Sequence, residues 1–190
     1  MEAHSQRPHE PDDDVELVLR VGEGDVSAYR ELVSRHAPKL LGFSARLLRD
    51  PTEAEDIVQE TFLRLWQRAG EYSPAARVTT WLHRIAHNLA VDRLRARKRS
   101  TAFDEEELPV SAPQPVLLDE ARRARSLEQA LATLPERQAA ALTLVHLHGL
   151  SGAEASEVLG IGVEALESLL ARGRRALKER LHDEAAGALP

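Results

Sequence analysis

Residues 149–181 read GLSGAEASEVLGIGVEALESLLARGRRALKERL, and this stretch decides the fold of the C-terminal part of the chain. Ser151, followed three residues later by Glu154, forms the pattern of a capping box, so we expect a helix to begin there. Gly160 should end that helix, and a longer basic helix should begin near Val163. Two helices joined by a tight turn with glycine indicate a helix-turn-helix motif, whose second helix is sized for the DNA major groove. A plain helical hairpin in a bundle is the alternative for this stretch taken alone.

The longer helix has one apolar side, on which Gly173 also lies. A glycine on a buried helix face lets another helix approach closely, so we expect this side to pack inward. The apolar residues of this side are Leu166, Leu170, Leu177 and Leu181.

Composition favours helices throughout the chain. Of 190 residues, 43% are hydrophobic and only 4% are aromatic, so leucine and alanine fill most of the core. We therefore expect an all-α protein. The absence of cysteine excludes disulfides and thiolate zinc sites. No apolar run approaches the roughly 18 residues of a membrane span, and the polar N-terminus lacks a signal-peptide core. We expect a soluble, cytoplasmic protein without membrane insertion.

Charge is distributed unevenly along the chain, whose net charge is −6. Residues 84–99 hold six Lys or Arg against the single acid Asp92, whereas residues 102–120 hold six acids and no base. DNA responds to the local electrostatic field more than to the net charge of the whole protein. A DNA contact near residues 84–99 is therefore compatible with a net charge of −6.

These patterns predict two small helical domains joined by a flexible acidic linker. The expected segments are a disordered tail over 1–13, a helical domain over 14–99, a linker over 100–119, a helix-turn-helix domain over 120–182 and a tail over 183–190. The linker prediction depends on its three prolines and its lack of helical period. Within the first domain, Pro38 marks a kink or division of a long helix.

A helix with an acidic, amide-rich outer face is expected to begin at Asp50, with Pro51 in its first position. Its core face should carry Ala54, Ile57, Val58, Phe62 and Leu65. The opposite face should carry Asp56, Gln59, Glu60 and Leu63. One leucine within such a face is typical of a partner-binding surface, but a merely solvated face is the alternative.

The next helix, after a loop over 71–78, should be capped by Thr79 or Thr80 and end in the basic run. Its buried stripe is predicted to be Trp81, Leu82, Ile85, Ala86 and Leu89. Trp81 and Asn88 lie near the start of this helix, and arginines follow them. This order suits single-stranded DNA, because bases can stack on the ring while the phosphates contact the arginines. The residues predicted to contact DNA here are Trp81, Arg84, His87, Asn88, Val91 and Arg95.

Histidines offer no convincing metal site. His83 and His87 stand four residues apart, a spacing that can ligate zinc, but no glutamate lies between them as in a metalloprotease. His146 and His148 are placed at a helix C-terminus, where the dipole tolerates positive charge. No metal, cofactor or catalytic arrangement is expected, and neither is enzymatic activity.

Two blocks of this chain resemble the extracytoplasmic-function (group IV) sigma factors of bacterial RNA polymerase. AEDIVQETFLRLW followed by TTWLHRIAHNLAVDRLR is similar to their region two, and LEQALATLPERQAAALTLVHLHGLS with the helix-turn-helix is similar to their region four. The resemblance covers roughly 14–99 and 120–182, and the order and spacing of both blocks make it specific.

The resemblance implies a protein that directs the polymerase core to promoters. Asp56, Gln59, Glu60 and Leu63 would dock on the clamp helices of the largest polymerase subunit. The loop over 71–78 would capture a flipped base of the minus-ten element, and the following helix would contact the melted strand. The linker would enter the polymerase toward the RNA exit path. Region four would read the minus-thirty-five element, and an anti-sigma factor would restrain the protein.

The recognition helix departs from the family pattern. Ala165, Glu167 and Leu169 stand where the family usually carries Thr, Lys and Arg, and acids in the leading turns repel phosphate. A glutamate can still accept a hydrogen bond from cytosine in the major groove. The DNA contacts expected in this helix are Glu164, Glu167, Ser168, Arg172 and Arg175. Two alternatives follow: a sigma-like decoy or adaptor that binds an anti-sigma protein without reading DNA, and a stand-alone helix-turn-helix regulator.

Overall fold

The computed structural model describes residues 14–74, 76–100 and 119–187, and all regular elements within these ranges are helical, as predicted. The predicted tail over 1–13 and nearly all of the predicted linker lie outside the described residues. The elements in chain order are α1 (Asp14–Gly22), α2 (Val26–Leu48), α3 (Pro51–Arg68), η1 (Ala69–Glu71), α4 (Val78–Ser100), α5 (Asp119–Ala132), α6 (Glu136–Leu142), the π-helical turn η2 (Thr143–Leu147), α7 (Gly152–Leu159) and α8 (Val163–Gly187).

Helices α1 to α4 form a bundle in which α2 contacts each of the other three. Side-chain caps set the helix starts: Asp25 accepts the backbone N–H of Ser27 at 2.7 Å, and Asp50 accepts that of Glu53 at 3.0 Å. The helix α2 continues through Pro38 without division. Burial of apolar side chains on both sides of the proline outweighs its missing backbone hydrogen bond.

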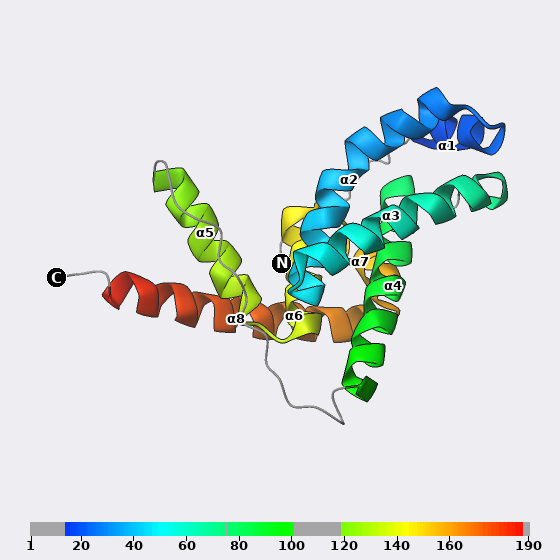
Figure 1. Ribbon diagram of the computed structural model, residues 1–190. Helices are drawn as coiled ribbons and strands as arrows, with labels where there is room; N and C mark the ends of the chain where they lie inside the picture. Colours follow the sequence, from blue (N-terminus) through cyan, green and yellow to red (C-terminus); the bar gives the residue numbers. More distant parts are fainter. Residues whose placement is uncertain (1–13, 75, 101–118, 188–190) are drawn as a thin grey trace.

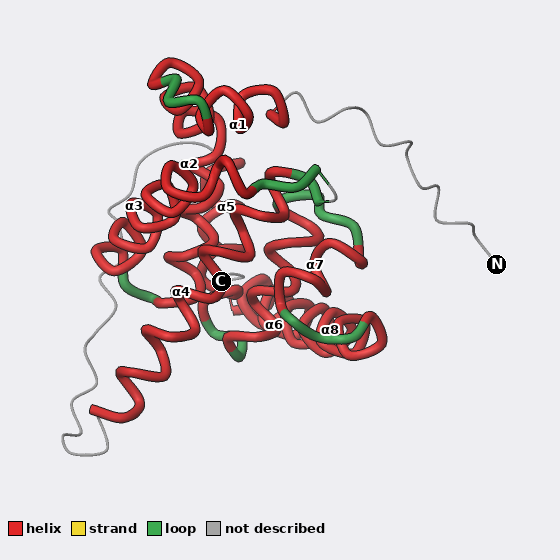
Figure 2. Tube along the Cα trace, turned by 90° about the vertical axis from the view of Figure 1, so that its right-hand side faces the viewer, coloured by secondary structure: helices red, strands yellow, loops and turns green. Residues whose placement is uncertain are grey.

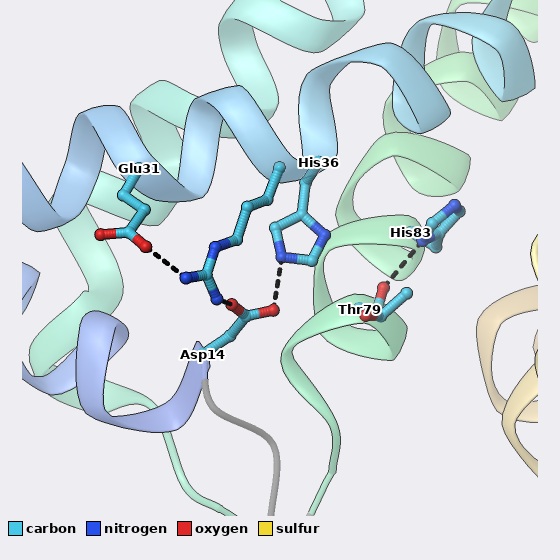
Figure 3. A network of polar contacts seen from close by, with 6 residues as sticks. Asp14, Glu31, His36, Thr79 and His83 are labelled. Atoms are coloured by element: carbon cyan, nitrogen blue, oxygen red, sulfur yellow. Dashed lines mark hydrogen bonds and ion pairs between the residues drawn. The ribbon is translucent and has the colours of Figure 1, made fainter.

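The first residue of α1 is held by two side chains of α2. Figure 3 shows Asp14 facing His36, whose Nε2 lies 2.7 Å from the carboxylate, and Arg35 donates to the other carboxylate oxygen at 2.8 Å. Both Asp14 and His36 are buried, so these bonds satisfy polar groups that water cannot reach. This contact fixes where α1 crosses α2.

The start of α4 differs from the prediction. The helix begins at Val78, so neither Thr79 nor Thr80 caps it, and Thr80 is buried. The fully buried stripe consists of Val78, Leu82, Ala86 and Ala90 together with His83, whereas Trp81, Ile85 and Leu89 are only half-buried. Trp81, Ile85 and Leu89 lie to one side of the fully buried stripe around the helix, so they pack at the edge of the bundle.

The C-terminal part confirms the predicted helix-turn-helix. Glu154 N–H donates to Ser151 Oγ at 3.3 Å and Ser151 N–H donates to Glu154 at 2.7 Å, which is the capping box, and Gly160 ends α7 with φ 62°. Gly173 packs against α6, because a Cβ there would lie 2.9 Å from Leu142 Cδ1. Leu166 and Leu170 are buried as predicted.

The two halves of the chain pack against each other. Helix α2 contacts α6 and α4 contacts α7, and one hydrophobic cluster includes buried residues of both halves. Figure 1 shows α5 and the C-terminal half of α8 projecting away from this common core, and Figure 2 shows α1 and α8 at opposite ends of the molecule. Independent folding of the two predicted domains stays a prediction.

Candidate nucleic-acid and polymerase interface

The outer face of α3 presents the residues expected to bind polymerase. Asp56 and Gln59 are exposed, Glu60 is half-buried, and the Leu63 side chain is 48% exposed. On the opposite side, Ala54, Ile57, Phe62 and Leu65 are buried in the bundle, while Val58 is half-buried. The exposed Leu63 side chain at the centre of this acidic face is accessible to a partner.

A basic pocket lies between α3 and α4. Its volume is about 160 Å³. The Trp81 ring is held in place by Tyr72, with ring centroids 5.1 Å apart. Three guanidinium groups, an amide and an indole in one pocket provide charge for a phosphate and a flat surface for a base. The lining residues are Arg64, Arg68, Trp81, Arg84, Ile85 and Asn88.

Arg64 and Arg68 are the residues that sequence reasoning missed. They stand four apart near the C-terminal end of α3, so they share one helical face. Arg64 also donates to Glu60 at 2.8 Å, which holds its side chain along the helix. The sequence shows two arginines at positions i and i+4 of one helix. Only the packing of α3 on α4 shows that these two side chains line the same pocket as Trp81.

His87 does not belong with these residues. It is half-buried on the inner side of α4, where its ring lies 6.5 Å from that of Phe43, and its Nδ1 is buried without a hydrogen-bond partner among the described residues. Burial lowers the pKa of His87, which disfavours the charged form of the ring. The structure therefore does not favour His87 as a DNA contact. Of the other residues expected to contact DNA from α4, Trp81, Arg84 and Val91 are half-buried, and Asn88 and Arg95 are exposed.

Carboxylates neutralise part of the basic run at the end of α4. Arg93 and Arg97 lie 3.8 and 3.5 Å from the Glu53 carboxylate, and Arg95 lies 3.7 Å from Asp92. Arg95 remains highly exposed, with 73% of its side chain in solvent. Such exposed pairs contribute little stability and exchange readily, so the run keeps its attraction for phosphate.

The leading turns of α8 face solvent. Glu164, Glu167 and Ser168 are exposed, as are Arg172 and Arg175 one to two turns later. This places all five residues expected to contact DNA on the outer side of the helix-turn-helix. Glu164 and Glu167 precede Arg172 and Arg175 along the helix. The N-terminal turns of α8, which would enter the major groove, therefore carry carboxylates.

Two histidines meet where the halves of the molecule join. His83 Nε2 lies 2.8 Å from His148 Nδ1, and His83 Nδ1 lies 2.8 Å from the carbonyl oxygen of Thr79, the contact drawn in Figure 3. A carbonyl only accepts, so His83 carries its proton on Nδ1 and His148 donates to His83 Nε2. Burial lowers the pKa of both rings to about 4. His148 lies at a helix C-terminus as expected, where it caps η2, but burial between the two halves lowers its pKa and so disfavours the charged form.

The π-helical turn η2 explains the position of His148. The His148 N–H donates to the carbonyl of Thr143 at 2.9 Å, a five-residue span in place of the four of an α-helix. The extra residue turns the His148 ring toward α2 and α4, where it lies 6.3 Å from the Phe43 ring.

The described part of the chain contains no group of three or more His, Cys, Asp or Glu that could hold a metal ion. In the same residues, no helix is both long and apolar enough to cross a membrane.

Two parts of the chain match known family models. Residues 32–100 match Sigma-70 region 2, and residues 124–177 match Sigma-70, region 4. Together with the basic pocket and the helix-turn-helix, these matches define a sigma-70-type transcription initiation factor.

Two similar proteins show to which family of sigma factors the chain belongs. The ECF RNA polymerase sigma factor SigK of Mycobacterium sp. (strain KMS) is 33% identical over 178 residues, which cover 88% of this chain and 91% of that protein. SigW of Bacillus subtilis (strain 168) is 29% identical over 178 residues, covering 87% and 95%. The chain belongs to the extracytoplasmic-function (ECF) family of RNA polymerase sigma factors.

Solved structures share the fold. CnrH, solved in complex with the cytosolic domain of CnrY, matches with a TM-score of 0.65 and 26% identity, covering 90% of this chain and 97% of that one. RpoE of Bartonella quintana, solved in complex with the anti-sigma factor NepR, matches with a TM-score of 0.70 and 24% identity, covering 83% and 98%.

Proposed function

We propose that this ECF sigma factor docks on the polymerase core through the outer face of α3. Leu63 and Asp56 would contact the clamp helices of the largest subunit. The support is the exposure of these side chains on a helix whose opposite side buries Ala54, Ile57, Phe62 and Leu65 in the bundle. Both side chains lie outside the core, so substituting them should change docking without changing the fold.

The basic pocket between α3 and α4 is the observation that carries the DNA-binding part of the proposal. A base unstacked from the minus-ten strand would lie against Trp81, while the guanidinium groups of Arg64, Arg68 and Arg84 hold adjacent phosphates. Such stacking contributes about 1–3 kcal/mol per base. An indole face beside guanidinium groups suits a melted strand, because an unstacked base can stack on the ring while the arginines hold its phosphates.

The second DNA contact is assigned to α8, which would read the minus-thirty-five element in the major groove. Arg172 and Arg175 would meet phosphates, and Glu167 would accept a hydrogen bond from a cytosine amino group. Exposure of all three side chains supports this assignment.

An anti-sigma protein is the proposed regulator. The support is that the related RpoE of Bartonella quintana was solved with the anti-sigma factor NepR and that CnrH was solved with the cytosolic domain of CnrY. Release from this partner in the cytoplasm would free the sigma factor for polymerase.

Transcription from a promoter library by reconstituted core polymerase tests the proposal. The wild-type protein should direct initiation at a defined set of promoters. The double substitution Asp56→Arg and Leu63→Arg should abolish core binding while helicity and melting temperature stay nearly unchanged. Loss of folding in that variant would mean that this face is part of the core and would refute the docking surface.

A decoy or adaptor that binds an anti-sigma protein without reading DNA is the second candidate. The exposed acids Glu164 and Glu167 in the leading turns of α8 favour it, because they repel phosphate. Core polymerase that binds the protein yet opens no promoter in the library would support this candidate.

A further inference from the structure

The last turn of α1 lies against the backbone of η1, the short helix that follows α3. A Cβ on Gly22 would lie 3.2 Å from the Gly70 nitrogen and 3.4 Å from the carbonyl carbon of Ala69. Contacts this short leave no room for a side chain unless backbone atoms shift, so glycine at position 22 permits the close approach. The Cβ position of Gly70 is open by contrast, since no atom lies within 4 Å of it.

The helix η1 leads directly into the basic pocket between α3 and α4. Arg68, which lines the pocket, precedes η1, and Tyr72 follows it, with its N–H donating to the Ala69 carbonyl at 3.2 Å. The Tyr72 ring packs 5.1 Å from that of Trp81, and its hydroxyl donates to the Ala76 carbonyl at 2.6 Å. The position of η1 therefore sets the ring that supports Trp81 and one end of the loop before α4.

Of the two segments in this contact, α1 is the more firmly held. Leu17, Val18 and Val21 of α1 are buried, and its first residue, Asp14, is bound by two side chains of α2. The helix η1 has three residues, of which only Ala69 is buried. A displacement forced at the contact therefore falls mainly on η1 and on Tyr72, which follows it.

We propose that Gly22 is a positioning residue for the basic pocket. The close approach of α1 holds η1, and through Tyr72 the Trp81 ring, where an unstacked base would stack. This inference rests on the proposed DNA-binding role of the pocket. Gly22 is not among the residues that line the pocket, so it acts through Tyr72 and Trp81.

This role affects bases and phosphates differently. Alanine at position 22 would displace η1 by a few tenths of an ångström, and the Trp81 ring would lose its fixed support. Stacking requires van der Waals contact between the ring and the base, whereas the attraction of a guanidinium for a phosphate falls off slowly with distance. Gly22→Ala changes no charge, so it should weaken the binding of bases more than that of phosphates.

Binding of two fluorescein-labelled single strands to the full-length chain, followed by anisotropy, tests the proposal. One is a 12-nucleotide strand of deoxyadenosine, and the other is the same strand with abasic central positions. Wild type should prefer the intact strand by at least about five-fold, the value of one weak stack. Gly22→Ala should reduce this preference by about two- to five-fold, as expected when one weak stack is partly or fully lost.

The control is Gly70→Ala, which makes the same substitution on the other side of the contact, where the Cβ meets no atom. It should keep the wild-type preference. Both affinities are measured on one preparation, so partial unfolding of a variant lowers them equally and leaves their ratio unchanged. Equal preference in Gly22→Ala and Gly70→Ala would overturn the inference.

The second measurement follows the Trp81 ring without DNA. The chain has two tryptophans, so Trp66→Phe leaves Trp81 as the only one. Acrylamide quenching of its fluorescence then reports how accessible the ring is. In this background Gly22→Ala should raise the quenching constant of Trp81, whereas Gly70→Ala should leave it unchanged. An unchanged constant in Gly22→Ala would refute the coupling from α1 to Trp81.

Failure of the proposed function has a different signature. Wild-type protein that binds the intact and abasic strands equally would refute stacking in the basic pocket, and the role of Gly22 with it. Wild-type protein that prefers the intact strand, with the same preference in Gly22→Ala, would refute the positioning role alone.

Discussion

The neutral pair of His83 and His148 predicts that acid destabilises the folded chain. Burial lowers the pKa of His83 to about 4, whereas the ordinary value is 6.5. A histidine whose pKa is lowered by folding stabilises the fold fully above pH 6.5, and this stability is lost as pH falls from 6.5 toward 4, because the unfolded chain then binds more protons. His36, Lys39 and Arg46 of α2 lie on the same side and add to the unfavourable field.

The magnitude follows from linkage. At pH 5, which is 1.5 units below 6.5, His83 should cost about 2 kcal/mol of unfolding free energy relative to pH 8. His148 is more exposed and adds less, since solvent screens its charge. Two protonated rings would place two N–H groups against each other across the 2.8 Å contact, so the pair titrates as a unit.

Urea unfolding at pH 8 and pH 5 measures this effect. His83→Gln removes the titrating group. Between pH 8 and pH 5, the unfolding free energy of this variant should therefore fall by about 2 kcal/mol less than that of the wild type. His146→Gln is the control, because His146 is an exposed histidine of η2, two residues before His148. An equal loss for wild type and His83→Gln would refute a buried, neutral His83.

Two further predictions concern packing and DNA. Gly173→Val should lower the unfolding free energy by about 1–3 kcal/mol, because its Cβ would lie 2.9 Å from Leu142. The control Gly70→Ala should not destabilise the fold, since no atom lies within 4 Å of its Cβ. Thermal melting compares the two variants. In α8, Glu167→Lys should strengthen binding to unrelated duplex and weaken discrimination among upstream elements, and Arg175→Ala should weaken binding to all sequences by about 1 kcal/mol. Transcription from templates with single-base changes in the upstream element checks both, and an unchanged Glu167→Lys would show that Glu167 does not face DNA.

Local signals determined the helices of this protein. Asp50 with Pro51, and Ser151 with Glu154, began their helices where the sequence predicted, because a cap satisfies backbone groups within three residues of itself. The sequence also placed Leu63 outside and Leu166 inside, since helical periodicity separates the two faces of a helix. The family assignment depends on the same kind of information, the order and spacing of local blocks.

The tertiary structure alone decided which faces meet. His148 contacts His83 across 65 residues of sequence, and Glu157 contacts Arg84 across 73. No periodicity encodes such pairs, because they depend on how α6 and α7 pack on α2 and α4. The same packing turned His87 inward and brought Arg64 and Arg68 beside Trp81. The sequence thus determined the helices and their polar faces, while burial of the common core selected which of those faces are covered and which remain exposed.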